Sequence, residues 1–362
     1  MLVMPSNPSH ELTFVTNTDT IRELLKVIDR SGLGIALVVD DCRRLQATIT
    51  DGDVRRAILF GIELDAVVSE LLTMRKNSGR DITPVTAPLG STAEALRQLM
   101  TEHAVRQVPI LDADHSVVDI ALASDYLAIP SLALDGFIMA GGFGKRLMPL
   151  TENCPKPMLP VNGKPILEHL VGKLKAAGIL HVHISTHYLA DSITAHFHDG
   201  KDFGVNIEYV GEDQPMGTAG ALAKVGVGDV PLLVVNGDIL TSIDFRAMLE
   251  FHNEHAADMT VAVRQHEVQI PYGVVTTEGV NAIRIDEKPT IRRFINAGIY
   301  LVHPRVCQMV PSDHRVDMPD LITSLISRGQ RVICFPVREY WLDIGQIEHY
   351  ERASLDAAHG MV

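Results

Sequence analysis

Cysteine is scarce in this sequence and its spacing is irregular. There is no C-x-x-C pair among the four cysteines, which are Cys42, Cys154, Cys307 and Cys334. The absence of paired spacing argues against a disulfide framework and against a cysteine zinc site. The pattern fits a protein of the reducing cytoplasm, which is the location that we expect.

Long hydrophobic runs and an excess of positive charge are also absent. No apolar run approaches the roughly 20 residues that a membrane helix needs. The first residues, MLVMPSNPSH, lack the basic start and apolar centre of a secretory signal. The formal net charge of −13 argues against a general nucleic-acid or anionic-membrane binder, although it allows a local basic pocket for phosphates. We therefore expect neither a nucleic acid nor a membrane as a partner.

Histidine pairs are a feature that could suggest a metal. The spacing H-x-H occurs twice, in His181/His183 and in His196/His198. Imidazole is a frequent metal ligand. We favour solvated surface or strand histidines for both pairs and keep metal binding as the alternative.

The N-terminal third of the chain reads as two copies of one unit. A length of 362 residues suggests two or three domains at about 150 residues each. In the first copy, IRELLKVIDR predicts a helix, GIALVVD and LQATIT predict strands, and DGDVRRAILFG begins a second helix. In the second copy, TAEALRQLMTEH, VRQVPILDADHSVVDIAL and SDYLA repeat this helix–strand–strand–helix order. Such self-similarity indicates a tandem repeat.

This tandem resembles a pair of CBS domains, which are modules that often bind adenine nucleotides and regulate an attached protein. The family's ribose-binding pattern is Ser/Thr-x-x-Asp at a helix start, and T-D-G-D from Thr50 to Asp53 matches it. The resemblance implies that these two residues receive the ribose while the helix N-terminus faces phosphate. Asp125 is the counterpart in the second copy, but Leu122 stands where the hydroxyl residue would be. We favour the first site, and the alternative is that both aspartates are only helix N-caps.

Residues 136–362 alternate apolar strand segments with amphipathic helix segments. This alternation predicts an open, mostly parallel α/β sheet. Ligands in such sheets bind at the carboxyl ends of the strands. We therefore divide the chain into a regulatory pair over residues 1–128, a linker over 129–135 and a second domain over 136–362.

The second domain opens with GFIMAGGFGKRLMPLTENCPKPMLPVNGKPI, residues 136–166. A short apolar run precedes a glycine-rich turn, and glycine lets backbone N–H groups approach an anion closely. Cations just after the turn would neutralise phosphate charge. The residues of the turn that we expect to contact a nucleotide are Ala140, Gly141, Gly142, Gly144 and Lys145.

This segment closely resembles the signature of the sugar-1-phosphate nucleotidyltransferases. The resemblance implies a Rossmann-like, mixed and mostly parallel open sheet, and a reaction of an NTP with a sugar 1-phosphate that releases pyrophosphate. Such chemistry needs positioning, cations around the phosphates, and carboxylates for Mg²⁺ rather than a covalent nucleophile. The family usually has Ser or Thr at the position of Lys145. This departure leaves the role of Lys145 open between a further phosphate contact and an exposed cation.

The resemblance also assigns the remaining site residues. It places Arg146, Lys156 and Lys288 on the reacting phosphates and the sugar phosphate. The implied Mg²⁺ ligands are Asp238, which ends the strand LLVVNGD, and Asp343 in YWLDIGQ. The expected nucleobase loop contains Gly217 and Thr218, and the expected sugar contacts are Gly273, Glu287 and Asn296.

Fewer residues bear on which nucleobase and which sugar 1-phosphate the protein would use. Glu212 lies at the base-reading position, and a carboxylate can accept from both N–H groups on the edge of guanine, so we favour GTP. A register shift to Gln214 would favour UTP or dTTP instead. The combination with a CBS pair resembles enzymes that make GDP-glucosamine for nonulosonic acids, with mannose or heptose 1-phosphate as alternatives. A homo-oligomer is expected, and the rival hypothesis is a non-catalytic nucleotide or nucleotide-sugar sensor.

Overall fold

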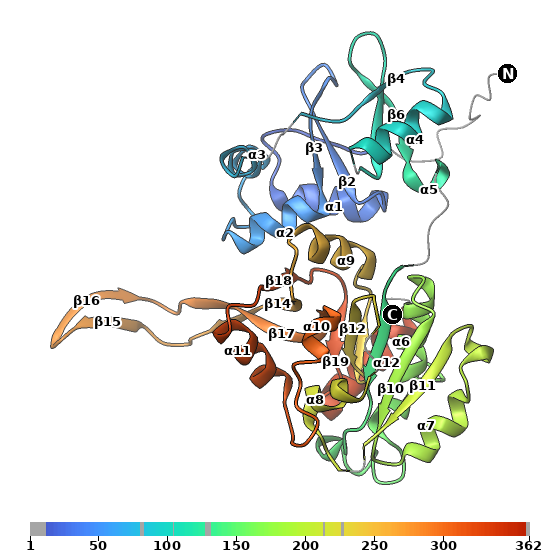
Figure 1. Ribbon diagram of the computed structural model, residues 1–362. Coiled ribbons are helices and arrows are strands. Elements are labelled where there is room, and N and C mark those ends of the chain that lie inside the picture. The colour runs from blue at the N-terminus through green and yellow to red at the C-terminus, as the bar shows by residue number, and fades with distance from the viewer. Residues whose placement is uncertain are drawn as a thin grey trace. The chain divides into compact units, whose positions relative to one another are not determined.

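The structure is a computed structural model that describes residues 12–79, 83–103, 105–126, 132–212, 214–225 and 228–359. The chain folds into two compact units, Met1–Pro130 and Ser131–Val362, whose elements are labelled in Figure 1. Within the described ranges, no helix combines the length and apolar character needed to cross a membrane. Each unit is described separately below.

The first unit contains the predicted repeat. Each half has a short strand parallel to a second strand, which then pairs antiparallel with a third. The first half consists of β1 Phe14–Val15, α1 Ile21–Ser31, β2 Ile35–Val39, β3 Leu45–Thr50, α2 Asp51–Leu59 and α3 Val68–Asn77. The second half consists of β4 Ala87–Pro88, α4 Ala93–Glu102, β5 Gln107–Leu111, β6 Val117–Leu122 and α5 Ala123–Tyr126. The short strands β1 and β4 were not predicted, because two residues carry no periodic signal.

Local capping and apolar contacts hold this unit together. Thr20 and Glu23 form a reciprocal capping box at the start of α1, and Gly32 ends that helix at a φ of 64°. The two halves meet through buried Leu33, Ile35 and Ile120. The repeat is therefore one compact structure rather than two independent modules.

The second unit contains all the remaining elements. From its start to the middle of its sheet, these are β7 Asp135–Met139, η1 Lys145–Leu147, η2 Lys156–Met158, β8 Pro160–Val161, β9 Lys164–Pro165, α6 Ile166–Ala176, β10 His181–Thr186, α7 Ala190–Phe197, η3 Lys201–Phe203, β11 Asn206–Gly211, α8 Gly217–Gly220, η4 Ala221–Lys224 and β12 Leu232–Asn236. The rest are β13 Ile239–Thr241, α9 Phe245–Glu254, β14 Met259–Gln269, β15 Val274–Glu278, β16 Asn281–Asp286, β17 Thr290–Val302, α10 Pro304–Cys307, α11 Met318–Ser327, β18 Val332–Pro336, β19 Trp341–Asp343 and α12 Ile347–Ala358. Strand β7 begins at the last residue that we assigned to the linker, and Leu132 and Leu134 before it are buried.

The main sheet has the order β11-β10-β7-β12-β17-β14-β18. Only β17 runs antiparallel to the other six strands of this sheet. This confirms the predicted open, mostly parallel α/β architecture. The chain moves outward from β7 through β10 to β11 and then returns to the other side of β7 as β12. The carboxyl ends of β7 and β12 therefore flank the point at which the strand order reverses, where open α/β sheets bind ligands.

Both faces of the sheet are covered, so its central strands are buried. Phe137 belongs to a core with Leu222, Val306 and Leu325 on one face. On the other face, a Cβ placed on Gly136 would lie 3.1 Å from Leu174 of α6. This glycine therefore permits a close approach of helix and strand.

A long β-ribbon leaves the sheet where β14 and β17 extend beyond their neighbours. Their pairing continues to Gln269 opposite Thr290, and β15 pairs with β16 at the outer end. Figure 1 shows this ribbon projecting away from the sheet of its own unit. Its apolar side chains are exposed, including Val280 at 99% and Ile285 at 67%. The sequence analysis did not predict the ribbon.

Candidate functional sites

The glycine-rich loop follows β7 at the carboxyl edge of the sheet. The backbone N–H of Ala140 donates to the carbonyl oxygen of Ser185, 3.1 Å away, which ties the start of the loop to β10. Gly144 has a φ of 63°, and a Cβ there would lie 3.1 Å from Cβ of Lys156. Glycine at this position therefore lets the segment that carries Lys156 pack against the loop.

Lys156 and the two predicted metal ligands converge. Lys156 Nζ forms an ion pair with Oδ2 of Asp238 and lies 4.0 Å from Oδ1 of Asp343. Asp238 follows β12, whereas Asp343 ends β19, and the pairing of Ile239 with Asp343 brings the two carboxylates together. Residues more than 100 positions apart in the sequence therefore share one site.

The electrostatics of this site favour a bound cation. Burial and the Asp238 carboxylate raise the pKa of Asp343, and this rise is only partly offset by Lys156, Arg146 and His349. Oδ1 of Asp238 is buried and has no hydrogen-bond partner among the residues that the structure describes. An unsatisfied buried carboxylate oxygen beside a second carboxylate suits a hard divalent cation such as Mg²⁺. The two aspartates therefore fit the implied metal.

Arg146 lies beside the same carboxylates. A Cβ placed on Gly345 would lie 3.6 Å from Oδ1 of Asp343 and 3.8 Å from an Arg146 guanidinium nitrogen. Lys145 is exposed, and its Nζ lies 5.7 Å from the ring centroid of Phe143. Of the two neighbouring cations, Arg146 is thus the one next to the acidic pair.

Glu212 lies next to Gly141 of the glycine-rich loop. A Cβ on Gly141 would lie 3.1 Å from Oε1 of Glu212, and Oε2 accepts a hydrogen bond from the Met216 N–H at 3.0 Å. His187 Nδ1 lies 2.8 Å from the Glu212 carbonyl oxygen. The Phe143 ring lies beside the rings of His187 and Tyr188, and we had not predicted that these three side chains meet here. The position of His187 directly after a predicted strand was the available signal.

Gly217 and Thr218 position a short helix against the segment before α11. Gly217 has a φ of 83°, and a Cβ there would collide with the Val316 carbonyl oxygen. The Thr218 N–H donates to Asp317 Oδ1 at 3.1 Å, and Thr218 Oγ1 accepts from the Met318 N–H at 2.7 Å. The contact of this loop with a nucleobase stays a prediction.

The predicted sugar contacts are divided between two places. Asn296 Oδ1 accepts a hydrogen bond from the Gly298 N–H at 2.9 Å, and a Cβ on Gly298 would lie 2.5 Å from Nδ2 of Asn236, at the end of β12. The sequence analysis did not single out Asn236. By contrast, Gly273, Glu287 and Lys288 lie on the projecting ribbon and are exposed. The structure therefore places Asn296 near the carboxyl edge and does not bring these three together with the aspartates.

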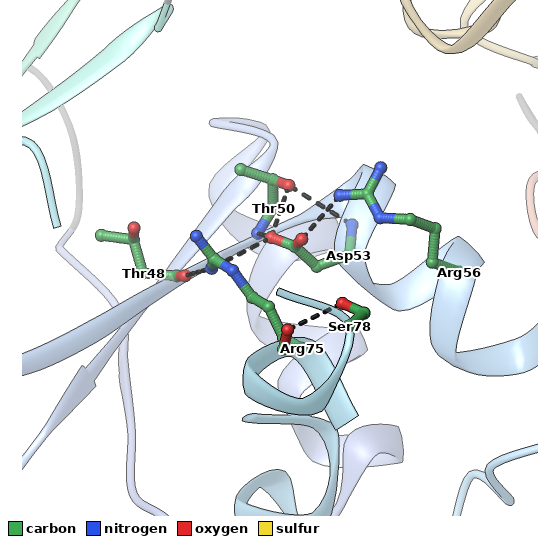
Figure 2. Close-up of polar contacts among 6 residues, drawn as sticks. All are labelled: Thr48, Thr50, Asp53, Arg56, Arg75 and Ser78. Carbon is green, nitrogen blue, oxygen red and sulfur yellow. Dashed lines mark hydrogen bonds and ion pairs between the residues drawn. The ribbon is translucent and has the colours of Figure 1, made fainter. Parts of the chain in front are cut away.

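The candidate nucleotide site of the first unit centres on Asp53, which is 5% exposed. Figure 2 shows its carboxylate between Thr50 and two arginines. The Thr50 N–H and Oγ1 donate to Asp53 Oδ2 at 3.0 and 2.8 Å, and Arg56 donates to Oδ1 at 2.6 Å. Arg75 binds the Thr48 carbonyl oxygen at 2.7 Å and lies 3.4 Å from Asp53 Oδ2. Both predicted residues therefore form a capping box at the start of α2.

These contacts hold the Asp53 carboxylate in its ionised form. Burial alone would raise its pKa, but Arg75, Arg56 and the Thr50 N–H outweigh burial and lower it. The N-cap interpretation is therefore present in the structure, together with two cationic neighbours. Binding of adenine nucleotides at Thr50 and Asp53 stays a prediction, as does any contact through Asp125 in α5.

Comparisons with known proteins match both units. A family model described as nucleotidyl transferase matches residues 135–360, and a CBS domain model matches residues 7–60. The second unit is similar to the mannose-1-phosphate guanylyltransferase of Mycobacterium tuberculosis, with 34% identity over 63% of this chain and 66% of the relative. It is also similar to the UTP–glucose-1-phosphate uridylyltransferase of Synechocystis, with 31% identity over 61% of this chain and 62% of the relative. The chain thus spans less than two thirds of either relative.

A solved structure supports the same assignment of fold. A Bacillus anthracis protein provisionally named glucose-1-phosphate thymidylyltransferase superposes with a TM-score of 0.51 and 29% identity. The match covers 62% of this chain and 95% of that protein.

Removing the charge of Asp343 should separate the carboxylate repulsion from metal binding. Because its pKa is raised in the folded state, ionisation of Asp343 costs stability once the pH exceeds the ordinary carboxyl pKa. We expect Asp343→Asn to raise the melting temperature slightly at pH 7 in EDTA, since solvent screens part of the repulsion. Millimolar Mg²⁺ should then raise the melting temperature of the wild type but not of the variant. An unchanged Mg²⁺ response in Asp343→Asn would contradict the assignment.

Proposed function

Because the chain belongs to the nucleotidyl transferase family, we propose that it transfers a nucleotidyl group from an NTP to a sugar 1-phosphate. In this reaction a phosphate oxygen of the sugar 1-phosphate forms a bond to the α-phosphorus of the NTP. The bond from that phosphorus to the bridging oxygen breaks, and pyrophosphate leaves with the electron pair. The observation that carries this proposal is the convergence of Arg146 and Lys156 with Asp238 and Asp343 at the carboxyl edge of the sheet.

Each member of this constellation has a role suited to its charge. Asp238 and Asp343 would hold Mg²⁺, which supplies charge neutralisation at the phosphates when it is bound. Lys156, 9% exposed, presents a positioned ammonium group beside the two aspartates. Arg146 offers the planar donor set that suits a leaving pyrophosphate. The N–H groups of residues 141–144 would donate to the remaining phosphate oxygens, whereas that of Ala140 is bonded to Ser185.

Guanine is the base that Glu212 favours. Its carboxylate lies beside Gly141 and accepts one hydrogen bond, from Met216. An ionised carboxylate has about four lone-pair sites, so acceptors remain for the two adjacent N–H donors of guanine. The name of the mycobacterial relative agrees with GTP, and that of the cyanobacterial relative keeps UTP as the alternative.

For the sugar, we propose glucosamine 1-phosphate in a nonulosonic-acid or surface-glycan pathway. The support is the combination of a CBS repeat with a guanylyltransferase-like unit in one chain. Mannose 1-phosphate is the first alternative, because the mycobacterial relative is named for it. Heptose 1-phosphate is the second alternative.

The location and the assembly of the protein are also part of this proposal. A cytoplasmic location agrees with the four free cysteines. A homo-oligomer agrees with the exposed apolar side chains of the ribbon, since large exposed apolar patches on proteins often mark interaction sites. Adenine nucleotides remain the proposed ligands of the first unit.

The proposed reaction should be tested as pyrophosphate release over a grid of substrates. GTP, UTP, dTTP, ATP and CTP would each be combined with the 1-phosphates of glucosamine, N-acetylglucosamine, mannose, glucose and heptose, with Mg²⁺ present. We expect release with GTP and one of these sugars. Asp238→Asn should lower the rate at least about 100-fold, because it removes charge stabilisation at the reacting phosphates. The sensor hypothesis would be favoured if the protein binds GTP but releases no pyrophosphate with any pair of substrates, whether or not adenine nucleotides are present.

Exchange of Glu212 for glutamine should change the choice of base. Glutamine offers one acceptor and one donor, which matches uracil or thymine better than guanine. We expect Glu212→Gln to lower kcat/KM for GTP by about 10- to 100-fold, the loss that one or two charge-assisted hydrogen bonds represent, and to favour UTP or dTTP in relative terms. Glu351→Gln, at an exposed glutamate of α12, is the matched control. Equal base preference in all three proteins would remove Glu212 from base recognition.

A further inference from the structure

A second group of ligating side chains lies at the opposite edge of the sheet from the aspartates. His181 and His183 are two residues apart on β10, so their rings leave the same face of the strand. Strand β7 lies on one side of β10 and begins at Asp135, and β11 lies on the other side with Glu208 paired to His183. Three adjacent parallel strands therefore bring imidazole and carboxylate groups to one place.

The distances within this group are short enough for a common ligand. One nitrogen from each histidine and one carboxylate oxygen of Asp135 all lie within 4.8 Å of one another. Glu208 lies on the other side, with Oε1 3.5 Å from His181 Nε2 and Oε2 3.5 Å from His183 Nδ1. Among the residues that the structure describes, this is the one group of three or more His, Cys, Asp or Glu side chains with such spacing.

The group is partly buried and lies beside a cavity. The His183 side chain is 9% exposed, whereas Glu208 is 58% exposed, so the group reaches from the interior to solvent. His183 and Glu208 also line a cavity of about 290 Å³. Lys224 lines this cavity too, and its ammonium donates to the Gly211 carbonyl oxygen at 2.8 Å. His183 therefore borders this cavity, whereas the His181 side chain is 38% exposed and open to solvent.

The chemistry of the donor set selects the type of ion. The two neutral imidazoles and the Asp135 carboxylate, together with the neighbouring Glu208 carboxylate, carry a net charge of −2, which a divalent cation would neutralise. Imidazole nitrogen suits Zn²⁺ and similar transition metals, whereas Mg²⁺ prefers oxygen ligands. The three grouped ligands, with a water in the fourth position, meet the tetrahedral preference of Zn²⁺.

We propose that Asp135, His181 and His183 bind one Zn²⁺ ion at the amino edge of the sheet, with the Glu208 carboxylate beside the two histidines. This site is separate from the aspartate pair, because Asp135 and His181 begin their strands, whereas the glycine-rich loop and Asp238 follow the ends of theirs. The bound ion ties β7 to β10 near the first residues of these two strands. It therefore has a structural role that does not depend on the proposed transfer reaction.

The second H-x-H pair provides a matched control. His196 is in the last turn of α7 and His198 is its C-cap, and residues two apart on a helix do not face one another. His196 instead pairs with Glu168 at 3.1 Å. The double variant His196→Ala/His198→Ala removes the same side chains as His181→Ala/His183→Ala but leaves the proposed site intact.

The test is zinc binding by the full chain after removal of metals with a chelator. Zn²⁺ would be titrated against a chromophoric competitor with millimolar Mg²⁺ present to occupy the aspartate pair, and bound zinc would be counted by elemental analysis. We expect about one Zn²⁺ per chain in the wild type and in the His196/His198 control. Affinity should fall at least about 100-fold in His181→Ala/His183→Ala, since loss of a residue that only hydrogen-bonds to a metal ligand already costs 10- to 100-fold.

A second variant covers the case in which the double histidine variant does not fold. Asp135→Asn leaves both rings in place and should weaken Zn²⁺ binding at least about tenfold. The melting temperature should rise with Zn²⁺ in the wild type and the control, and this rise should be smaller in Asp135→Asn. A wild type that binds no Zn²⁺, or equal binding in the wild type and in Asp135→Asn, would overturn the proposal.

Discussion

The close approach of two partly buried carboxylates, Asp238 and Asp343, is the constraint on which the site at the carboxyl edge of the sheet depends. Burial and, after it, repulsion from Asp238 raise the pKa of Asp343, so ionising both carboxylates there is unfavourable. Lys156 offsets part of this repulsion through its ion pair with Asp238, yet one Asp238 oxygen keeps no protein partner in the described part of the chain. These features support our proposal that the pair receives a cation.

Three features of the fold bring these charged groups together. The reversal of strand order between β7 and β12 sets the carboxyl ends of these strands at the position where open α/β sheets bind ligands, and Asp238 follows β12 there. The small sheet of β13 and β19 then carries Asp343 back to the same place from the end of the chain. Gly144 allows the segment of Lys156 to approach. Sequence-distant charges thus meet because backbone pairing, and not their mutual attraction, positions them.

The sequence was informative where signals are local. Buried apolar runs, glycines and capping residues predicted the strands of the parallel sheet, the repeat and the loop before Lys145. The sequence did not reveal features that depend on register or on distant partners. Arg75 reaches Asp53 across 22 positions, and the ribbon that carries Glu287 has no buried face to mark its strands. The proximity of His181 to Asp135 likewise required knowledge of which strands are neighbours.

The most direct test of the central claim is a count of Mn²⁺ ions, as a paramagnetic substitute for Mg²⁺, bound by the protein in an electron paramagnetic resonance titration. We predict one Mn²⁺ site whose affinity falls at least about 100-fold in Asp238→Asn and in Asp343→Asn. Asp320→Asn, at an exposed aspartate of α11, should retain this site. Loss in only one of the two variants, or in neither, would show that the two carboxylates do not share a metal.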